Sequence, residues 1–233
     1  MNHDASPNIV VDVRNYLNYL QRLGITELSL RPTTKPQGST LTEPKEPHAS
    51  ISQLAQLAAS VRDCQRCRLH QGRTQVVFGT GDPNADLVFV GEAPGHDEDL
   101  QGEPFVGAAG QLLTRIIEAM QLTRDQVYIL NVVKCRPPNN RNPRPDEVAA
   151  CRPILQAQLD CLRPRVICAL GAFAAQTLLQ TDERISRLRG HFHNMGEIPV
   201  MPTYHPAYLL RNPQGKRAVW EDMQQILRLL GLR

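Results

Sequence analysis

Three short apolar runs, each followed by a turn and an amphipathic segment, constrain the fold of this chain most strongly. The runs cover residues 87–90, 127–131 and 166–170, and a run of this length between turn residues is typical of a buried strand. Residues 146–162, after the second run, have the spacing of a helix. Strands that alternate with helices predict a mainly parallel sheet covered by helices on both faces. We therefore expect an α/β fold.

The remaining elements continue this alternation. Further helices are expected at residues 50–63, 111–120, 171–180 and 216–230, and further strands at residues 189–195 and 198–203. Pro153 must kink the helix at 146–162 or mark a break in it, because proline lacks the amide donor that the helix interior needs.

Small and polar residues follow the predicted strands. Glu92, Asn131, Gly171 and His205 each stand at a strand's carboxyl end, where open α/β sheets bind their ligands. Any one of them could instead cap a helix or complete a turn. All four together predict a single cleft.

Residues 91–99, with residues 104–107 just after them, form the most distinctive of these loops. Glycine and proline make the turn tight, and the amide groups at the next helix start can face a polar ligand. The carboxylates of Glu92 and Glu98 would repel a phosphate. The loop therefore predicts a polar ligand other than a phosphate.

Asn131 and Phe105 are candidates for reading a flat ring. A carboxamide at the end of a buried strand offers one acceptor and two donors, which suits a heterocycle with adjacent C=O and N–H groups. Phe105 could stack on the same ring, or it could fill the core as most phenylalanines do. Asn139 and Asn140, in the following loop, have the composition of turn formers.

Six cysteines without a secretory signal argue against a disulfide framework. Cys64 and Cys67 form a C-x2-C pair, and Cys135 and Cys151 are two further thiols. Four thiolates from two segments could hold zinc or an iron–sulfur cluster, and their spacing does not decide between the two. Cys161 and Cys168 lie in apolar segments, as inert core cysteines do.

Composition limits the remaining classes. The 233 residues carry a formal charge of only +3, which is compatible with a nucleic-acid partner but does not require one. No apolar run approaches the roughly 18 residues of a membrane span, and the first residues lack the pattern of a signal peptide. A cytoplasmic protein without membrane contact is expected.

The first 50 residues form a separate part of the predicted organisation. Residues 8–23 have helical apolar spacing, and residues 31–50 are rich in proline, as flexible linkers are. The helix could dock a protein partner or pack on the domain at 51–233.

Five short motifs, found in the same order, give the chain a resemblance to the iron–sulfur (family-four) uracil-DNA glycosylases. The similarity covers roughly residues 51–230, and the five motifs together are specific although each is weak. They are Cys64-x2-Cys67, GEAPG at 91–95, PFVG at 104–107, NVVKCRPP at 131–138 and HPAYLL at 205–210.

The resemblance implies a fold, a cofactor and an activity. The fold is a three-layer α/β/α sandwich around a four-stranded parallel sheet. The cofactor is a structural [4Fe-4S] cluster on Cys64, Cys67, Cys135 and Cys151. The activity is that of a DNA repair glycosylase, which acts on uracil-containing DNA, hydrolyses the N-glycosidic bond and leaves an abasic site. We expect the protein to be a monomer.

Roles for the pocket residues follow from the same resemblance. Phe105 would stack on an extruded uracil, and Asn131 would accept from its N3–H and donate to O4. His205 would donate to O2 as negative charge develops on the leaving base. The backbone at Glu92 and Ala93 would line the same side of the pocket.

The residues that position the attacking water are less fully determined by the resemblance. Ala93 stands where some members of the superfamily have an aspartate, and Asn140 would then help to position water. Glu92 or Glu98 would support the site, or Glu98 could crowd the C5 edge of uracil and exclude thymine. His96 departs from the acid found in many relatives.

Loops that should border the cleft are basic, as DNA contact requires. Leu188, nearby, could wedge into a duplex or belong to the core. A DNA-binding module that has lost turnover is the competing function, although Glu92, Asn131, Asn140 and His205 speak against it. The basic residues are Arg136, Arg141, Arg144, Arg187, Arg189, Arg211, Lys216 and Arg217.

Overall fold

The computed structural model describes residues 47–232, with side chains from residue 51 onward. The helix predicted at residues 8–23 and most of the linker predicted at residues 31–50 lie outside this range. The last four linker residues, 47–50, are instead the start of a helix, so the predicted end of the linker is wrong. No helix in the described part of the chain combines the length and the apolar character needed to cross a bilayer. The helices are α2 (Pro47–Val61), α3 (His96–Gln101), α4 (Ala108–Ala119), α5 (Pro145–Leu162), α6 (Gly171–Leu179), α7 (Ile185–Leu188), α8 (Pro206–Arg211) and α9 (Lys216–Leu230). The strands are β1 (Thr80–Gly81), β2 (Leu87–Gly91), β3 (Tyr128–Asn131), β4 (Val166–Leu170), β5 (His193–Met195) and β6 (Ile198–Thr203).

The strands form one sheet in the order β1-β3-β2-β4-β6-β5. The four inner strands β3, β2, β4 and β6 are parallel, which confirms the predicted parallel sheet. The short outer strands β1 and β5 pair antiparallel to β3 and β6. The sheet thus has six strands, two more than the four-stranded core that the resemblance implies.

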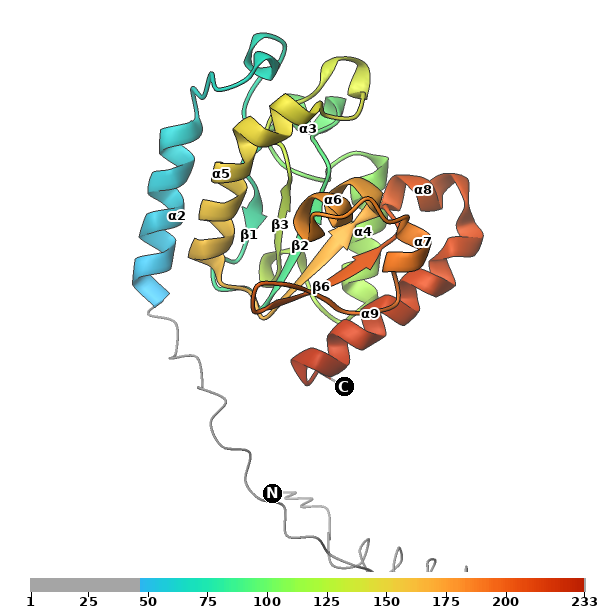
Figure 1. Cartoon of the computed structure of the whole chain (residues 1–233). Coiled ribbons are helices and arrows are strands. Elements are labelled where there is room, and N and C mark those ends of the chain that lie inside the picture. Colours follow the sequence, from blue (N-terminus) through green and yellow to red (C-terminus); the bar gives the residue numbers. More distant parts are fainter. Residues whose placement is uncertain (1–46, 233) are drawn as a thin grey trace, which may run out of the picture. The chain divides into compact units, whose positions relative to one another are not determined.

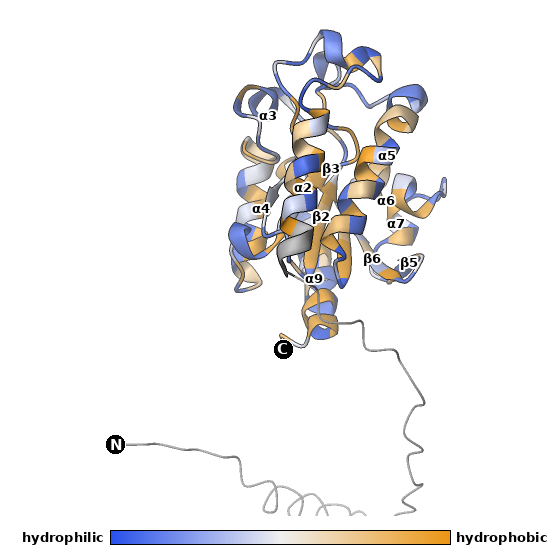
Figure 2. Ribbon diagram, turned by 90° about the vertical axis from the view of Figure 1, so that its left-hand side faces the viewer, coloured by the Kyte–Doolittle hydropathy of each residue, from blue (hydrophilic) through white to orange (hydrophobic). Residues whose placement is uncertain are grey.

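Helices cover both faces of this sheet, as the apolar runs predict (Figure 1). Along β2, Val88 and Val90 pack toward α2, α5 and α6. Leu87 and Phe89 pack toward α4 and α9 on the opposite face. All four side chains are buried, because a strand between two helical layers has no solvent-facing side. Figure 2 shows the resulting hydrophobic centre between the helices. The arrangement is the expected three-layer α/β/α fold.

Helix α5 continues through Pro153, so of the two predicted alternatives the break is wrong and the kink stays a prediction. Proline at this position removes the bond to the carbonyl of Ala149. Ala149 is exposed, and its carbonyl can therefore bond water instead. This local loss is small compared with the burial of the apolar face of the helix, which includes Ile154, Leu155 and Leu159.

The carboxyl ends of the parallel strands meet at one edge of the sheet. Gly91 at the end of β2 is in register with Asn131 at the end of β3. Leu170 and Thr203 pair in the same way at the ends of β4 and β6. Residues from the four loops that follow are thereby brought together at this edge.

Candidate active site

Asn131 and Phe105 meet over Gly91, at the joint end of β2 and β3. A Cβ at Gly91 would overlap the Asn131 carboxamide oxygen and would lie 2.5 Å from Cζ of Phe105. Only a residue without a side chain lets the carboxamide and the aromatic ring approach the strand end so closely. Residues 40 positions apart in the sequence thus share one small site, as the strand-end argument predicts.

The carboxamide of Asn131 is buried with an unused acceptor. The residue is 1% exposed, and its Oδ1 has no hydrogen-bond partner among the residues that the structure describes. Leaving a buried acceptor unpaired costs about 1–3 kcal/mol. Such a group at a ligand-binding edge of the sheet is suited to accept a hydrogen bond from a ligand.

The backbone of Phe105 is held in an unusual conformation beside Asn131. Its φ is 56°, a left-handed value that costs energy for a bulky residue and is found mainly at functional sites. Arg124 donates from Nη1 to the Phe105 carbonyl at 3.2 Å and from Nη2 to that of Pro104 at 2.8 Å. The Phe105 carbonyl also packs closely against Gly110 of α4, where a Cβ would overlap it. These contacts fix the ring of Phe105, which is 7% exposed.

His205 faces Phe105 from the loop between β6 and α8. The two ring centroids are 5.7 Å apart. Nδ1 of His205 accepts the backbone N–H of Ala207 at 3.1 Å, so in the neutral ring the proton is on Nε2. Burial, with a smaller contribution from Arg211, lowers the pKa of His205 to about 4, and Glu98 opposes this change. His205 is therefore a neutral Nε2–H donor at physiological pH.

A buried ion pair supports the loop that carries His205, and sequence reasoning gave it no role. Asp222 of α9 is fully buried and accepts from Oγ1 of Thr203 at 2.6 Å. It also accepts from Arg189 at 3.2 Å and 2.6 Å, and the Arg189 guanidinium lies over the Tyr204 ring at 5.4 Å. Burial raises the pKa of Asp222, and Thr203 and Arg189 counteract this. The sequence feature that could have revealed this ion pair is the position of Asp222 on the otherwise apolar face of α9.

Glu98 joins the two halves of the first loop. Its Oε2 accepts from Gly95 N at 3.1 Å, and its Oε1 accepts from Val106 N and Gly107 N at 3.0 Å each. Three backbone donors occupy the carboxylate. The contact ties α3 to the segment around Phe105, which is a supporting arrangement of the kind that the sequence left open for Glu98.

Glu92 directly follows Gly91, and its side chain is partly buried. Burial raises the pKa of its carboxyl group above the ordinary value. Its carbonyl accepts from Val133 N at 3.1 Å. Ala93, next to it, packs against the core on the α2 and α5 side. Both residues directly follow the end of β2, and the lining of a pocket by their backbone stays a prediction.

Asn140 belongs to an exposed network at the loop after β3. Arg136 donates from Nε to Oδ1 of Asn140 at 2.8 Å, and its Nη1 lies 2.9 Å from Nδ1 of His96. The network links the loop of Asn140 to the start of α3. Asn140 has a φ of 52°, consistent with the turn-forming role that loop asparagines commonly have.

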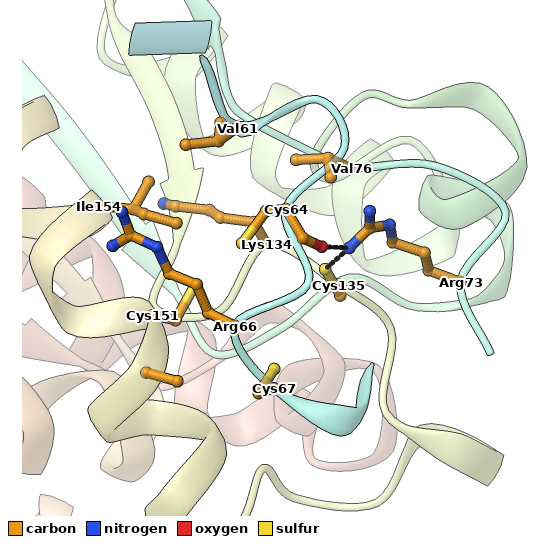
Figure 3. A pocket seen from close by; sticks show the side chains of 11 residues that line it. Val61, Cys64, Arg66, Cys67, Arg73, Val76, Lys134, Cys135, Cys151 and Ile154 are labelled. Atoms are coloured by element: carbon orange, nitrogen blue, oxygen red, sulfur yellow. Dashed lines mark hydrogen bonds between the residues drawn. The ribbon is translucent and has the colours of Figure 1, made fainter. Parts of the chain in front are cut away.

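Four cysteines from three segments line one cavity of about 20 Å³ (Figure 3). Cys64 and Cys67 come from the loop after α2, Cys135 from the loop after β3, and Cys151 from α5. Among residues 47–232, no three His, Cys, Asp or Glu side chains are arranged to hold a metal ion. The four thiols instead surround the cavity.

Two cationic side chains accompany these thiols. Arg73 donates from Nη1 to the Cys64 carbonyl at 2.6 Å and to Sγ of Cys135 at 3.3 Å. Lys134 lines the same cavity. Burial raises the pKa of Cys135 to about 11, against the opposing effect of Arg73. It also raises the pKa of Cys151, where Lys134 opposes the change. Without a metal these two thiols stay protonated at neutral pH, and metal binding would release their protons.

Several residues that the sequence placed at a DNA-binding rim have other functions. Arg141 makes a bidentate pair with the buried Glu147, at 2.8 Å and 2.6 Å, and Arg189 pairs with Asp222. Leu188 is 2% exposed, which confirms its core role and makes the wedge wrong. A buried carboxylate needs a cation, and Glu147 and Asp222 could not be recognised as buried from composition alone. The basic rim residues with exposed side chains are Arg144, Arg187, Arg211, Lys216 and Arg217.

Two exposed apolar side chains follow His205 closely and were not assigned a surface role from the sequence. Tyr208 and Leu210 on α8 are 40% and 46% exposed. The Tyr208 ring lies 5.0 Å from that of Tyr204. Large apolar groups beside a pocket are a common sign of a contact surface. Cys168, in contrast, is fully buried in β4, as predicted, and Cys161 is only partly buried.

Comparison with known proteins agrees with this architecture. Residues 78–224 match the sequence model of the uracil DNA glycosylase superfamily. A type-4 uracil-DNA glycosylase of Archaeoglobus fulgidus is 44% identical over 189 residues, which is 78% of this chain and 95% of that protein. One from Thermotoga maritima is 47% identical, over 71% of this chain and 88% of that protein. A type-5 uracil-DNA glycosylase of Thermus thermophilus is 31% identical, over 67% and 81% respectively. By its fold and by these similarities, the chain belongs to the uracil DNA glycosylase superfamily and, within it, to the type-4 uracil-DNA glycosylases.

Proposed function

We propose that this protein removes uracil from DNA by hydrolysing the N-glycosidic bond, which releases free uracil and leaves an abasic site. The observation that carries the proposal is the buried Oδ1 of Asn131, which has no partner within the described part of the chain and adjoins the ring of Phe105. Uracil presents an N–H donor next to a carbonyl acceptor on a flat ring. The activity also agrees with the names of the type-4 relatives.

Asn131 can separate uracil from cytosine. Its carboxamide would accept from N3–H of uracil and donate to O4. Cytosine has an acceptor at N3 and an amino donor at the neighbouring carbon, so both polar groups would be left unpaired. A buried mismatch of this kind can discriminate by about 10⁴-fold.

Phe105 supplies a rigid surface for the extruded base. A base inside a duplex is out of reach and must be flipped into a pocket, at a cost of a few kcal/mol. The ring of Phe105 is held by the left-handed backbone and the Arg124 contacts, so little entropy is lost when it stacks on the base.

His205 can stabilise the departing base. Cleavage leaves positive charge on the sugar and negative charge on uracil, and the neutral Nε2–H of His205 would donate to O2 as that charge grows. Its orientation is fixed in advance by the bond from Ala207. A preorganised donor of this type typically contributes about 3 kcal/mol.

Glu92 and Asn140 are proposed to bind and orient the attacking water. The carboxylate of Glu98 is engaged with three backbone amides, so it acts as a positioning residue for the first loop. Glu92 adjoins the pocket with no comparable set of partners and can support a water through its carboxylate. Asn140, held by Arg136, would orient that water toward a cationic sugar, which needs little activation of its nucleophile.

A [4Fe-4S] cluster is proposed for Cys64, Cys67, Cys135 and Cys151. Four thiols around one cavity are a complete ligand set for such a cluster, and the neighbouring Arg73 and Lys134 offset the negative charge that four thiolates bring. The cluster would hold together the segments before β1, after β3 and at α5. Its part in the reaction is structural, because the pocket residues supply the chemistry.

The face around His205 is proposed to contact DNA. The exposed Arg187, Arg211 and Lys216 can approach phosphates. Tyr208 and Leu210, both exposed, would occupy the space that the extruded base leaves in the stack, as apolar wedges do.

An oligonucleotide with a single uracil tests the proposal. Incubation with the enzyme, followed by alkali, should break the strand at the uracil position, while the same strand with thymine stays intact. The competing function, a DNA-binding module without turnover, would retard the oligonucleotide in a gel and give no break. Absence of a break at stoichiometric enzyme would contradict the proposed activity.

A further inference from the structure

Lys134 is a buried cation, and the charge it supplies at the cysteine cavity does not explain its contact with Asn131. It is 1% exposed. Its Nζ donates to the backbone carbonyl of Asn131 at 2.5 Å. An ammonium inside a protein is costly unless it is paired and hydrogen-bonded, and a methionine would fill the same space without that cost.

The same side chain borders the cysteine cavity. Lys134 lies among the residues that line it, together with all four cysteines (Figure 3). Cys135 is its neighbour in the chain, and both Cys135 and Cys151 interact with its charge. Lys134 therefore lines the cysteine cavity and at the same time donates from its ammonium to Asn131, the residue proposed to read the base.

The backbone around Lys134 also joins the two sites. Val132 N donates to the Gly91 carbonyl at 2.9 Å, and Val133 N donates to the Glu92 carbonyl at 3.1 Å. These bonds continue the pairing of β2 and β3 beyond the strand ends, toward Cys135. A displacement of Cys135 would therefore shift the backbone at the end of β3 and, through these bonds, the backbone of Gly91 and Glu92.

We propose that Lys134 is a positioning residue that couples the cysteine-bound group to uracil recognition. This inference rests on the proposed function. The negative charge of the ligated thiolates holds the ammonium in place, and the ammonium in turn holds the Asn131 carbonyl, which sets the carboxamide at the base. The cluster thereby acts on binding of the base from outside the pocket.

The test compares Lys134→Met with Gln158→Met in the full-length holoprotein. Gln158 is fully buried on α5, donates to the Phe78 carbonyl at 2.9 Å and does not line the cysteine cavity. It controls for the loss of a buried polar side chain. Lys134→Arg is the conservative variant. Two readouts are measured, namely the half-life of the visible absorbance under an iron chelator and the concentration of free uracil that half-inhibits the enzyme.

Lys134→Met should lose its colour about tenfold faster and should need about tenfold more uracil for inhibition, as loss of a supporting contact around a metal site commonly does. Lys134→Arg should recover part of both, and Gln158→Met should match the wild type. Wild-type values in both readouts, a change in only one of them, or equal losses in Gln158→Met would overturn the coupling. Failure of the wild type itself to release uracil would instead contradict the proposed function.

Discussion

At the scale of single residues, the pocket depends on the missing side chain at Gly91. The carboxamide of Asn131 and the ring of Phe105 occupy the volume that a Cβ would take. The sequence points to Asn131 and His205 because strand ends converge in a parallel sheet. It does not show that the Glu98 carboxylate accepts from three backbone amides, because two of them, Val106 and Gly107, belong to a loop eight and nine residues away.

Gly91→Ala should reduce kcat/KM for a uracil oligonucleotide by about a hundredfold, as a displacement near 1 Å in a reactive site can do. The methyl group would push the Asn131 carboxamide or the Phe105 ring away from the base. Gly72→Ala is the matched control, because a Cβ there would meet no atom within 4 Å. Steady-state kinetics measure both variants. Equal kinetics for Gly91→Ala and the wild type would show that the pocket lies elsewhere.

His205 should make the protein less stable in mild acid. Its pKa is lowered from 6.5 to about 4, so between these values the unfolded chain binds a proton that the native protein does not. The contribution of neutral His205 to the free energy of unfolding is therefore complete above pH 6.5 and decreases as the pH falls toward 4. The loss between pH 7 and 4.5 should be about 2 kcal/mol. Urea unfolding at both pH values should show this loss in the wild type and in the exposed-site control His191→Gln, but not in His205→Gln. The same slope in His205→Gln would contradict the assignment.

At the scale of elements, α9 does more than cover the sheet. Its buried Asp222 meets Thr203 at the end of β6 and Arg189 after α7. The apolar spacing of α9 and its bounds are predictable from periodicity. The ion pair is not, because a charge on an otherwise apolar face has no partner that the sequence identifies. The short helices α3 and α7, of six and four residues, are missed for a related reason: they contain too few turns to show a period.

Asp222→Asn should lower the free energy of unfolding by about 3 kcal/mol, because it leaves the partly buried charge of Arg189 without its counter-ion. Glu221→Gln, on the same helix, removes only an exposed pair with Arg217 and should cost less than about 1 kcal/mol. Denaturant unfolding of the two variants gives the comparison. Equal losses would mean that the buried pair does not support the loop of His205.

At the scale of the whole molecule, the cysteine site and the pocket belong to one continuous structure. The segment from Asn131 to Cys135 starts in the pocket and ends at the cavity. The alternation of strands and helices predicts this layout well, since it follows from apolar runs alone. The edge strands β1 and β5 could not be predicted correctly from the sequence. β1 has only two residues, which is too short for any pattern, while β5 is shorter than the strand predicted at 189–195.

Cys135→Ser should abolish most of the visible absorbance and reduce the iron bound per chain, because it removes one of four ligands. Cys168→Ser is the matched control, since that thiol is fully buried in β4 and does not line the cavity. Absorbance and iron analysis of the purified proteins provide the measurement. A colourless wild type with zinc on the same cysteines would replace the cluster with the alternative that spacing alone leaves open.

The most direct test of the account is the identity of the base that the enzyme releases. Three otherwise identical oligonucleotides, containing uracil, thymine or cytosine at one position, are mixed in equal amounts with the wild type, and free bases are quantified by mass spectrometry. We expect free uracil, with cytosine released at least about 10⁴-fold more slowly. Asn131→Ala should lose roughly a hundredfold in uracil release, because it leaves two polar groups of the base unpaired. Release of cytosine at a rate near that of uracil, or full activity in Asn131→Ala, would contradict the account.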